Sequence, residues 1–587
     1  MRIPQRFTAL VVATLVGVGL VAACSSPVDQ MRSAAEEFAS ALEGGDVSAA
    51  AALTSDPSVA TSTLTAVFDG LGSFDRDVTV TDVQETDGSG TVLLDVSWRF
   101  GDDKTWQYTT DASMTEVDGE WKWEFTPASV IPQMTANQTV RYTPTSPPGP
   151  DILTTSGTPL MQEQPVTVVN MTDDVDTAAL AGLLSPIAPT ITAQSLATAL
   201  ADAFGGPVTA ITLRADDFEP ISGQLQAMDG VTLSEQRRLL ALDRELASPV
   251  FGDLVALWQD KQDAATGWAV QLVDSDGTAT TVAGQDGTAA SDIPTTIDLT
   301  LQYAAEAALA DVPKQAAIVA IRPSTGDLVA VAQNEAADRQ GPIALTGLYP
   351  PGSTFKTVTT SAALQEGDVT PDSMVACPGT ENIEGRQIPN DDNFDLGTVP
   401  LHTAFARSCN TTMGRLAVGL EPDALTEAAL QFGLGVDYTS EGMTTVTGSV
   451  PPSDSSAARV EAAIGQGTVT ASPFGMALVA ASIARGSAPT PTLVRGEQVT
   501  ADPQPTPPPG EVAEQLRSMM REVVTEGTAT ALLHIPGLMG KTGTAETGTG
   551  SAHGWFIGIK GDLAFAVFVA EAGSSAPAVQ TAGRFLD

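Results

Sequence analysis

Two pairs of apolar strands, widely separated along the chain, most constrain how it can fold. Residues 315–333, QAAIVAIRPSTGDLVAVAQ, contain two apolar runs around a Ser-Thr-Gly-Asp turn at 324–327. Residues 554–570, GWFIGIKGDLAFAVFVA, repeat this arrangement around Gly561-Asp562. Helical patterns fill the interval between them, so the strands at both ends predict one α/β sandwich of roughly 290 residues, which we assign to 290–587.

Two further segments of this sandwich have recognisable patterns. Residues 296–312, TIDLTLQYAAEAALADV, read as a strand end that runs into an amphipathic helix. Residues 488–510 are rich in proline and are predicted to form a surface excursion.

Residues 28–143 are predicted to form a small α+β domain. In DQMRSAAEEFASALEGGD, apolar residues recur with helical spacing until Gly44-Gly45 ends the pattern. TVLLDVSWRF alternates as a half-buried strand, and TEVDGEWKWEF reads as a hairpin around an Asp118-Gly119 turn. The fold expected for the whole chain is therefore a multidomain α+β protein.

A linker and a less informative region separate these two parts. Residues 142–151, YTPTSPPGPD, are rich in proline and read as a linker. Residues 152–289 mix helical patterns with short apolar strands and contain no catalytic motif. A length of 587 residues allows roughly three or four domains, which agrees with this division.

The first 24 residues read as an export signal. Arg2 and Arg6 precede the apolar run 7–24, which is short for a spanning helix and suits a secretory signal, with an uncleaved membrane anchor as the alternative. The sequence VAAC at 21–24 resembles the lipobox of bacterial lipoproteins. That resemblance implies a signal peptide at 1–23, lipidation of Cys24, a tether at 24–27 and a lipid-anchored protein on the outer face of the cell membrane.

The charge excludes some partners. Lysine and arginine total 28 and aspartate and glutamate total 71, so the net charge is −43. This sign disfavours nucleic acid and gives no help in binding an anionic membrane surface. The acidic residues are spread along the chain, which favours a role in solubility.

Three short motifs occur in order inside the predicted sandwich. Ser353 precedes Lys356 by three residues, just after YPPG, and i and i+3 share a helical face. Ser408 and Asn410 form a Ser-x-Asn motif, and Lys541-Thr542-Gly543 follows. Ser353-x-x-Lys356 alone also fits a capped, solvated first turn of a helix that ends near Gly367, and Ser-x-Asn alone fits a helix cap.

Together these motifs resemble those of the penicillin-binding proteins and serine β-lactamases. IGQGTVTASPFGMA at 464–477, TIDLTLQYAAEAAL and GDLVAVAQ narrow the resemblance to class B penicillin-binding proteins. Residues 28–143 resemble the nuclear-transport-factor-2-like domain of the methicillin-resistance type. The resemblance implies a transpeptidase domain at 290–587 and a linking or dimerisation region at 152–289. It says nothing about a ligand pocket in 28–143, where a spacer role is the simpler reading.

The resemblance also implies a mechanism. Ser353 would be the nucleophile and Lys356, uncharged, its base, while Ser408 would relay a proton and Asn410 would hold substrate and Lys356. Lys541 and Thr542 would bind the terminal carboxylate of a D-Ala-D-Ala stem peptide. Gly543 would keep the strand clear for close approach, and the N–H groups of Ser353 and Thr544 would form the oxyanion hole.

The implied function is a peptidoglycan D,D-transpeptidase that β-lactams acylate, with stem peptides, β-lactams and proteins of cell-wall synthesis or division as partners. A D,D-carboxypeptidase or a β-lactamase is the alternative, and Glu421, Glu427 and Glu461 are the candidate deacylating groups. A non-catalytic β-lactam sensor or scaffold is a further alternative.

Cysteine and histidine give little support for other chemistry. Cys377 and Cys409 fit either a disulfide or two buried thiols in an oxidising compartment. The three histidines, His402, His534 and His553, are scattered without ligand spacing, so the sequence predicts neither a metal nor a cofactor, and a Ser-His-Asp triad is not expected.

Overall fold

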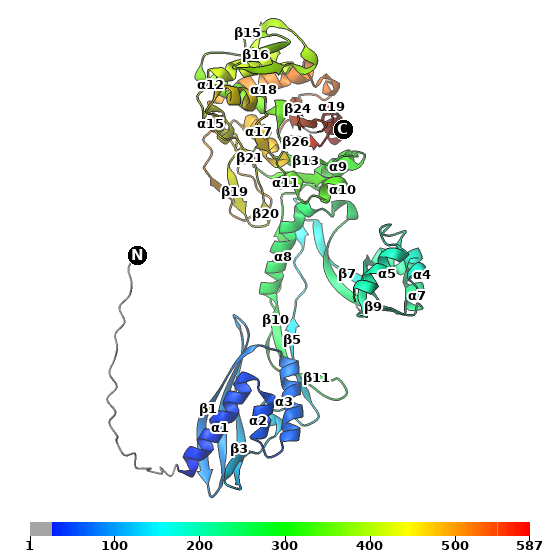
Figure 1. The fold of residues 1–587 in the computed structure, drawn as a ribbon, viewed down its shortest axis with the longest axis vertical. Helices are drawn as coiled ribbons and strands as arrows, with labels where there is room; N and C mark the ends of the chain where they lie inside the picture. The colour runs from blue at the N-terminus through cyan, green and yellow to red at the C-terminus, as the bar shows by residue number, and fades with distance from the viewer. Residues whose placement is uncertain (1–25, 204, 549) are drawn as a thin grey trace, which may run out of the picture. The chain divides into compact units, whose positions relative to one another are not determined.

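The computed structural model describes residues 26–203, 205–548 and 550–587 (Figure 1). The chain forms two compact units. The first contains the chain up to Pro147 together with Ala265–Thr288, and the second contains Pro148–Ala264 and Ala289–Asp587. Sequence analysis assigned 265–288 to the linking region, whereas the structure places this segment in the first unit.

The first unit is built from three helices and a four-stranded antiparallel sheet. The helices are α1 (Pro27–Gly44), α2 (Val47–Ala52) and α3 (Pro57–Leu71), and the strands are β1 (Asp75–Thr86), β2 (Ser89–Gly101), β3 (Lys104–Val117) and β4 (Glu120–Trp123). The hairpin predicted at Asp118-Gly119 joins β3 to β4, with φ of 54° and 85° at the two turn residues. Phe38 of α1 stacks on Trp123 of β4, with ring centroids 4.3 Å apart, so helix and sheet share one core.

A second small sheet completes this unit and is formed by strands that lie far apart in the sequence. It has the order β11-β10-β5, made of β5 (Thr139–Thr145), β10 (Gly267–Val273) and β11 (Ala279–Gln285). Trp268, Val270 and Leu272 of β10 join the same core as the helices. The predicted linker at 142–151 therefore begins inside a strand. Local composition does not reveal this pairing, because β5 and β10 meet only in three dimensions.

The part of the second unit between 148 and 264 contains a helical cluster and most of a sheet, to which residues 293–294 add one strand. The sheet has the order β12-β6-β7-β8, with β9 also paired to β7. Its strands are β6 (Ile152–Leu153), β7 (Pro159–Met171), β8 (Val208–Arg214), β9 (Val231–Ala241) and β12 (Ile293–Pro294). Helices α4 (Thr177–Leu184), α5 (Ala193–Asp202) and α7 (Ser222–Gln226) contribute to a separate small core, and α8 is Gly252–Ala265.

The main sheet of the second unit confirms both strand pairs expected from sequence. Its order is β14-β13-β26-β25-β24, with β13 (Ala316–Ile321), β14 (Leu328–Gln333), β24 (Met539–Ala545), β25 (His553–Ile559) and β26 (Ala564–Val569). Helices α9 (Leu299–Ala310) and α19 (Ala576–Leu586) lie on one side of it and α17 (Pro473–Arg485) on the other (Figure 1). β24 is the last strand in this order, so its outer edge carries no strand of this sheet.

The proline-rich segment 488–510 is only partly the surface excursion that we predicted. Leu493 and Val494 are buried, and Thr492 pairs with Asp327 beside β14. Farther on, β23 (Thr500–Asp502) pairs with β19 (Asp437–Ser440). Proline discourages regular strands but leaves the intervening apolar residues free to pack.

A helical region between β14 and β24 supplies the remaining elements around the candidate site. It contains η5 (Gly352–Phe355), α12 (Lys356–Glu366), α13 (Leu401–Ala406), α14 (Asn410–Val418) and α18 (Gly510–Thr525). Gly367 ends α12 in the left-handed conformation, with φ of 82°, as the sequence predicted. Within the described ranges, no helix combines the length and apolar character needed to span a bilayer.

Candidate active site

The turn that carries Ser353 is held by close backbone contacts. Tyr349 exchanges two hydrogen bonds with Ala471, and the Gly352 N–H donates to the Gly465 carbonyl at 3.0 Å. A Cβ at Gly465 would lie 2.0 Å from the Gly352 oxygen, and φ is positive at both glycines. Each of these two positions therefore requires glycine. The stretch 464–477 packs directly against the turn that carries Ser353, which we call the serine turn. Ser353 itself is half-buried, in the short 3₁₀ turn before α12.

Lys356 begins α12 and is fully buried. Its Nζ donates to the Ser408 carbonyl at 2.7 Å, to Ser408 Oγ at 3.1 Å and to Asn410 Oδ1 at 2.5 Å. Burial lowers the pKa of this amine well below its usual value, and the nearby Lys541 lowers it further. The alternative of a solvated first turn is therefore wrong.

Ser408 connects the two lysines of the site. Its hydroxyl accepts from Lys356 Nζ at 3.1 Å and from Lys541 Nζ at 2.9 Å. Ser408 has φ of 62°, an uncommon conformation for a residue with a side chain. The next residue, Cys409, forms a disulfide with Cys377. Of the two alternatives for these cysteines, a disulfide or two buried thiols, the structure contains the disulfide.

Lys541 lies on the edge strand β24 and is also fully buried. Its Nζ donates to the Thr542 carbonyl at 3.0 Å and lies 5.7 Å from the centre of the Phe405 ring. Burial lowers the pKa of Lys541 to about 7. Near neutral pH this amine can therefore gain or lose a proton.

The rest of the Lys541-Thr542-Gly543 motif packs against its neighbours. Thr542 Oγ1 lies 2.6 Å from Thr528 Oγ1, a hydroxyl that sequence analysis did not identify. A Cβ at Gly543 would lie 2.9 Å from the Pro351 oxygen and from Thr354 Cγ2. The lack of a side chain at Gly543 thus lets β24 approach the serine turn, a contact that sequence analysis did not predict. Thr544 lies on the same strand, with its carbonyl beside Gly352.

A second residue that sequence analysis missed is Asn390. It accepts hydrogen bonds from the backbone N–H groups of Asn410 and Thr411 at the start of α14. An isolated asparagine in a loop carries no recognisable signal, so only the three-dimensional contacts identify it.

The remaining predicted groups lie elsewhere. Glu421 and Glu427 are exposed, and Glu461 forms an ion pair with Arg386. His553 Nδ1 accepts from the Glu571 N–H at 3.1 Å, and burial lowers the pKa of its imidazole. The other histidines contact carboxylates: His402 bonds Glu522, and His534 lies near Asp587. Cys24 lies outside the described residues.

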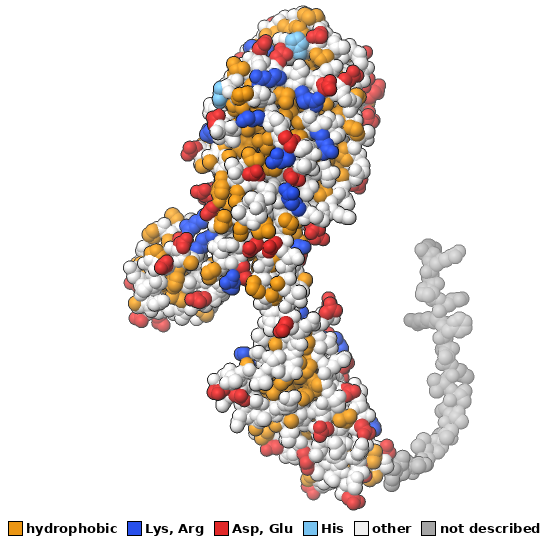
Figure 2. Space-filling view, turned by 180° about the vertical axis from the view of Figure 1, so that it is seen from behind, with side chains coloured by type: hydrophobic (Ala, Val, Ile, Leu, Met, Phe, Trp, Pro, Cys, Tyr) orange, Lys and Arg blue, Asp and Glu red, His pale blue; other side chains and the backbone are white. Residues whose placement is uncertain are grey.

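We also looked for a metal site and for an acidic surface patch. Across residues 26–203, 205–548 and 550–587, no cluster of three or more histidine, cysteine or acidic residues could hold a metal ion. Acidic side chains are spread over the faces visible in Figure 2 and form no single patch there.

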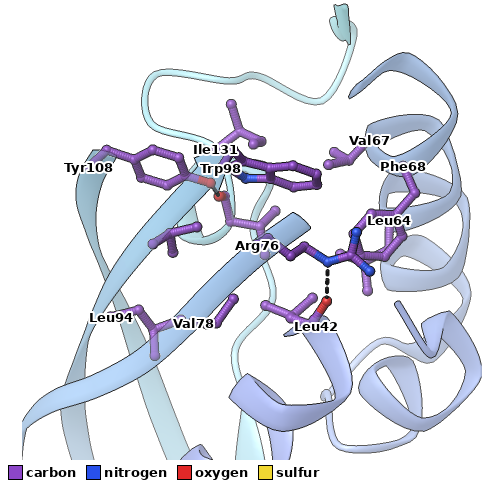
Figure 3. A pocket seen from close by; sticks show the side chains of 12 residues that line it. Leu42, Leu64, Val67, Phe68, Arg76, Val78, Leu94, Trp98, Tyr108 and Ile131 are labelled. Atoms are coloured by element: carbon purple, nitrogen blue, oxygen red, sulfur yellow. Dashed lines mark hydrogen bonds between the residues drawn. The ribbon is translucent and has the colours of Figure 1, made fainter. Parts of the chain in front are cut away.

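The first unit contains a small apolar cavity between its helices and its sheet (Figure 3). Arg76 extends into it and donates to the Leu42 carbonyl, with its guanidinium 4.5 Å from the centre of the Phe68 ring. The cavity measures about 20 Å³, which is room for roughly one water molecule. A ligand larger than water does not fit without rearrangement.

Comparisons with known proteins find matches for two parts of the chain. Residues 316–586 match the family model described as "Penicillin binding protein transpeptidase domain", and residues 30–138 match "NTF2-like N-terminal transpeptidase domain". The first match contains Ser353, Lys356, Ser408, Asn410 and Lys541.

Several curated proteins are similar to the C-terminal half. Peptidoglycan D,D-transpeptidase PbpA of Mycobacterium tuberculosis is 32% identical over 291 residues, which cover 42% of this chain and 59% of that protein. PbpA of Mycolicibacterium smegmatis is 32% identical over 314 residues, 45% of this chain and 63% of the relative. Penicillin-binding protein 3 of Bacillus subtilis is 24% identical over 353 residues, 51% of this chain and 50% of the relative. The chain thus spans less than two thirds of the length of each of these relatives.

Proposed function

Because the chain belongs to the penicillin-binding proteins, with a transpeptidase domain and an NTF2-like N-terminal domain, we propose that it is a peptidoglycan D,D-transpeptidase. Its substrates would be the stem peptides of peptidoglycan, and β-lactams would acylate the same serine. One observation carries this proposal: the Ser408 hydroxyl lies between two fully buried amines, at hydrogen-bond distance from each.

The contacts of Lys356 suit a base. A neutral amine has two N–H groups and one lone pair. The Ser408 carbonyl and Asn410 Oδ1 can only accept, so they take both N–H groups. In the neutral amine the third contact, with Ser408 Oγ at 3.1 Å, then falls on the lone pair, which can accept the proton of a serine hydroxyl. The lowered pKa of Lys356 favours the uncharged amine, which this step requires.

The reaction would proceed in two halves. Ser353 Oγ transfers its proton to Lys356 and attacks the carbonyl of the penultimate D-Ala. The C–N bond to the terminal D-Ala breaks, and the proton on Lys356 passes through the Ser408 hydroxyl to the departing amine, so that both residues return to their starting state. An amine of a neighbouring stem then attacks the ester, gives up its proton, and restores Ser353 as a hydroxyl.

The binding of the donor peptide would use the edge of the sheet. The outer edge of β24 can add an extended peptide as a further strand. Lys541 and Thr542 would bind the terminal carboxylate, and the N–H groups of Ser353 and Thr544 would stabilise the oxyanion. The same proposal puts the protein outside the cytoplasmic membrane, anchored through lipid on Cys24, with cell-wall synthesis or division proteins as partners.

Labelling with a fluorescent penicillin tests the proposal. Wild-type protein should acquire a stable label, and Ser353→Ala should acquire none. Ser361→Ala is the matched control, because Ser361 is a buried serine on the same helix, α12, and should label normally. Equal labelling of Ser353→Ala and wild type would contradict the proposal.

A second measurement separates transfer from hydrolysis. A stem pentapeptide is supplied with and without a second stem that carries a free amine. Release of D-Ala with a crosslinked product supports the transpeptidase. Release without any crosslink supports the D,D-carboxypeptidase, and loss of the penicillin label within seconds supports the β-lactamase.

A further inference from the structure

Helix α14, which begins at Asn410, is not capped by the residue that precedes it. The N-cap position belongs to Cys409, whose side chain makes no cap hydrogen bond and is engaged in the disulfide. The first N–H groups of a helix have no partner within the helix and need an acceptor from elsewhere. For α14 that acceptor comes from a different part of the chain.

Asn390 supplies this cap from 20 residues upstream. Its Oδ1 accepts the Asn410 N–H at 2.8 Å and the Thr411 N–H at 3.2 Å. One side-chain oxygen therefore satisfies two of the free donors at the helix start, as a local N-cap would do.

The other end of the Asn390 carboxamide is fixed as well. Its Nδ2 donates to the carbonyls of Pro378 and Phe394, both at 2.9 Å. The side chain is 2% exposed, so its orientation is set by these contacts and not by solvent. Nδ2 also donates to Cys377 Sγ at 3.5 Å, so Asn390 is a buried clamp whose carboxamide makes five hydrogen bonds.

This clamp acts on a residue of the candidate site. The Asn410 side chain donates from Nδ2 to the Pro389 carbonyl at 2.8 Å, and its Oδ1 accepts from Lys356 Nζ at 2.5 Å. Pro389 and Asn390 therefore hold both the backbone and the side chain of Asn410. The position of Asn410 Oδ1 in turn orients the Lys356 amine.

We propose that Asn390 is a positioning residue for acyl transfer: it fixes Asn410 and, through Asn410, the Lys356 amine that activates Ser353. This role rests on the transpeptidase function proposed above. Asn390 touches neither reacting atom, so it acts only through Asn410.

The chemistry of the site favours an amide over a carboxylate at position 390. An aspartate keeps the two acceptor contacts to α14 but lacks the two N–H donors. It also adds a negative charge near Lys356, which favours the protonated amine. The charged groups that act on Lys356 are Lys541 of β24 and Asp391, whereas Ser408 and Asn410 are neutral.

Three variants test the role of Asn390. Asn390→Leu keeps the approximate volume and removes every hydrogen bond of the side chain. Asn390→Asp keeps the two bonds to α14. Thr412→Val is the matched control, because Thr412 is a buried residue of the same helix whose hydroxyl bonds the Ala376 carbonyl and Cys409 Sγ and not Asn410. For each variant, the second-order rate constant of acylation by a fluorescent penicillin is measured from pH 5 to 10, together with the melting temperature.

The expected results distinguish positioning from stability. Asn390→Leu should acylate roughly tenfold to a hundredfold more slowly, because a displaced catalytic group loses proximity. Asn390→Asp should acylate with an acid limb moved to higher pH by about half a unit or more. Thr412→Val should lower the melting temperature without changing the pH profile.

Other results would overturn the inference. Acylation of Asn390→Leu within twofold of Thr412→Val at every pH excludes a positioning role. So does an Asn390→Asp profile that superimposes on that of wild type. A wild-type protein that is not acylated at Ser353 would instead overturn the transpeptidase function and this role together, so the two failures are distinguishable.

Discussion

Two lysines that are fully buried define the candidate site at the residue scale. Lys356 and Lys541 share the Ser408 hydroxyl, and each has a lowered pKa. An ammonium group buried in this way loses its hydration, so both residues disfavour the folded state as long as they carry charge. A site that sacrifices stability for an uncharged amine is typical of a functional requirement.

This cost predicts how stability depends on pH. In the unfolded chain Lys541 titrates near its ordinary value of 10.5, and in the fold near 7. Between these values the unfolded state binds more protons, so rising pH stabilises the wild-type protein. Lys541→Met lacks this contribution. Its stability relative to wild type should be greatest below pH 7 and should decline as pH rises toward 10.5.

Thermal unfolding of both proteins at pH 6, 8 and 10 provides the measurement, with the transition of the second unit monitored. Lys560→Met is a suitable control, because Lys560 is only half-buried and its Nζ bonds the Leu586 carbonyl and no residue of the candidate site. A constant difference between Lys541→Met and wild type at all three pH values would contradict the prediction.

At the scale of elements, three glycines interlock the segments that bear the motifs. Gly352 touches both Gly465 and Thr544, while Gly543 faces Pro351 and Thr354. The serine turn, the 464–477 stretch and β24 are thereby held at backbone contact distance. Side chains at these positions would push apart segments that the chemistry requires to be adjacent.

Gly465→Ala tests this interlock. The new Cβ would meet the Gly352 oxygen at 2.0 Å, in a backbone with φ of 72° that alanine rarely adopts. We expect a loss of about 2 kcal/mol or more in the free energy of unfolding, and a slower acylation of Ser353. Chemical denaturation and penicillin labelling measure both effects.

Gly496→Ala is the control for backbone strain alone, since its φ is 90° and a Cβ there meets no atom within 4 Å. It should lose some stability but label at the wild-type rate. Equal labelling rates in Gly465→Ala and Gly496→Ala would show that the interlock does not position Ser353.

The sequence predicts these elements unevenly. Both apolar hairpins, the helix after Ser353 and the Asp118-Gly119 turn follow from local patterns and glycine positions, and the structure contains all of them. The pairing of β5 with β10 and the cap that Asn390 provides depend on residues distant in the chain. No local period or propensity encodes such contacts, so they become visible only in the fold.

At the scale of the whole molecule, the first unit is discontinuous in sequence. β5 ends at Thr145, and its partner β10 begins at Gly267, the residue that pairs with Thr145. Trp268, Val270 and Leu272 complete the core that α1–α3 and the sheet begin. Residues 148–264 are thus an insertion, in sequence, between two adjacent antiparallel strands.

This arrangement predicts which fragments fold. A chain of residues 26–147 alone lacks β10 and β11, and we expect it to be poorly folded, since it exposes the apolar surface that β10 covers. A chain of 26–145 joined to 267–288 through Asn-Gly should fold, because this dipeptide makes a tight hairpin between adjacent strands. Circular dichroism and thermal unfolding compare the two. Cooperative unfolding of 26–147 at the temperature of the joined chain would contradict the prediction.

The inserted order of β5 and β10 has a consequence for biogenesis. During synthesis the polypeptide emerges from its N-terminal end, and β10 and β11 follow β5 only after about 120 further residues. The N-terminal unit therefore remains incomplete while about a fifth of the polypeptide is synthesised. Throughout that interval its open edge is the surface that a chaperone would have to shield.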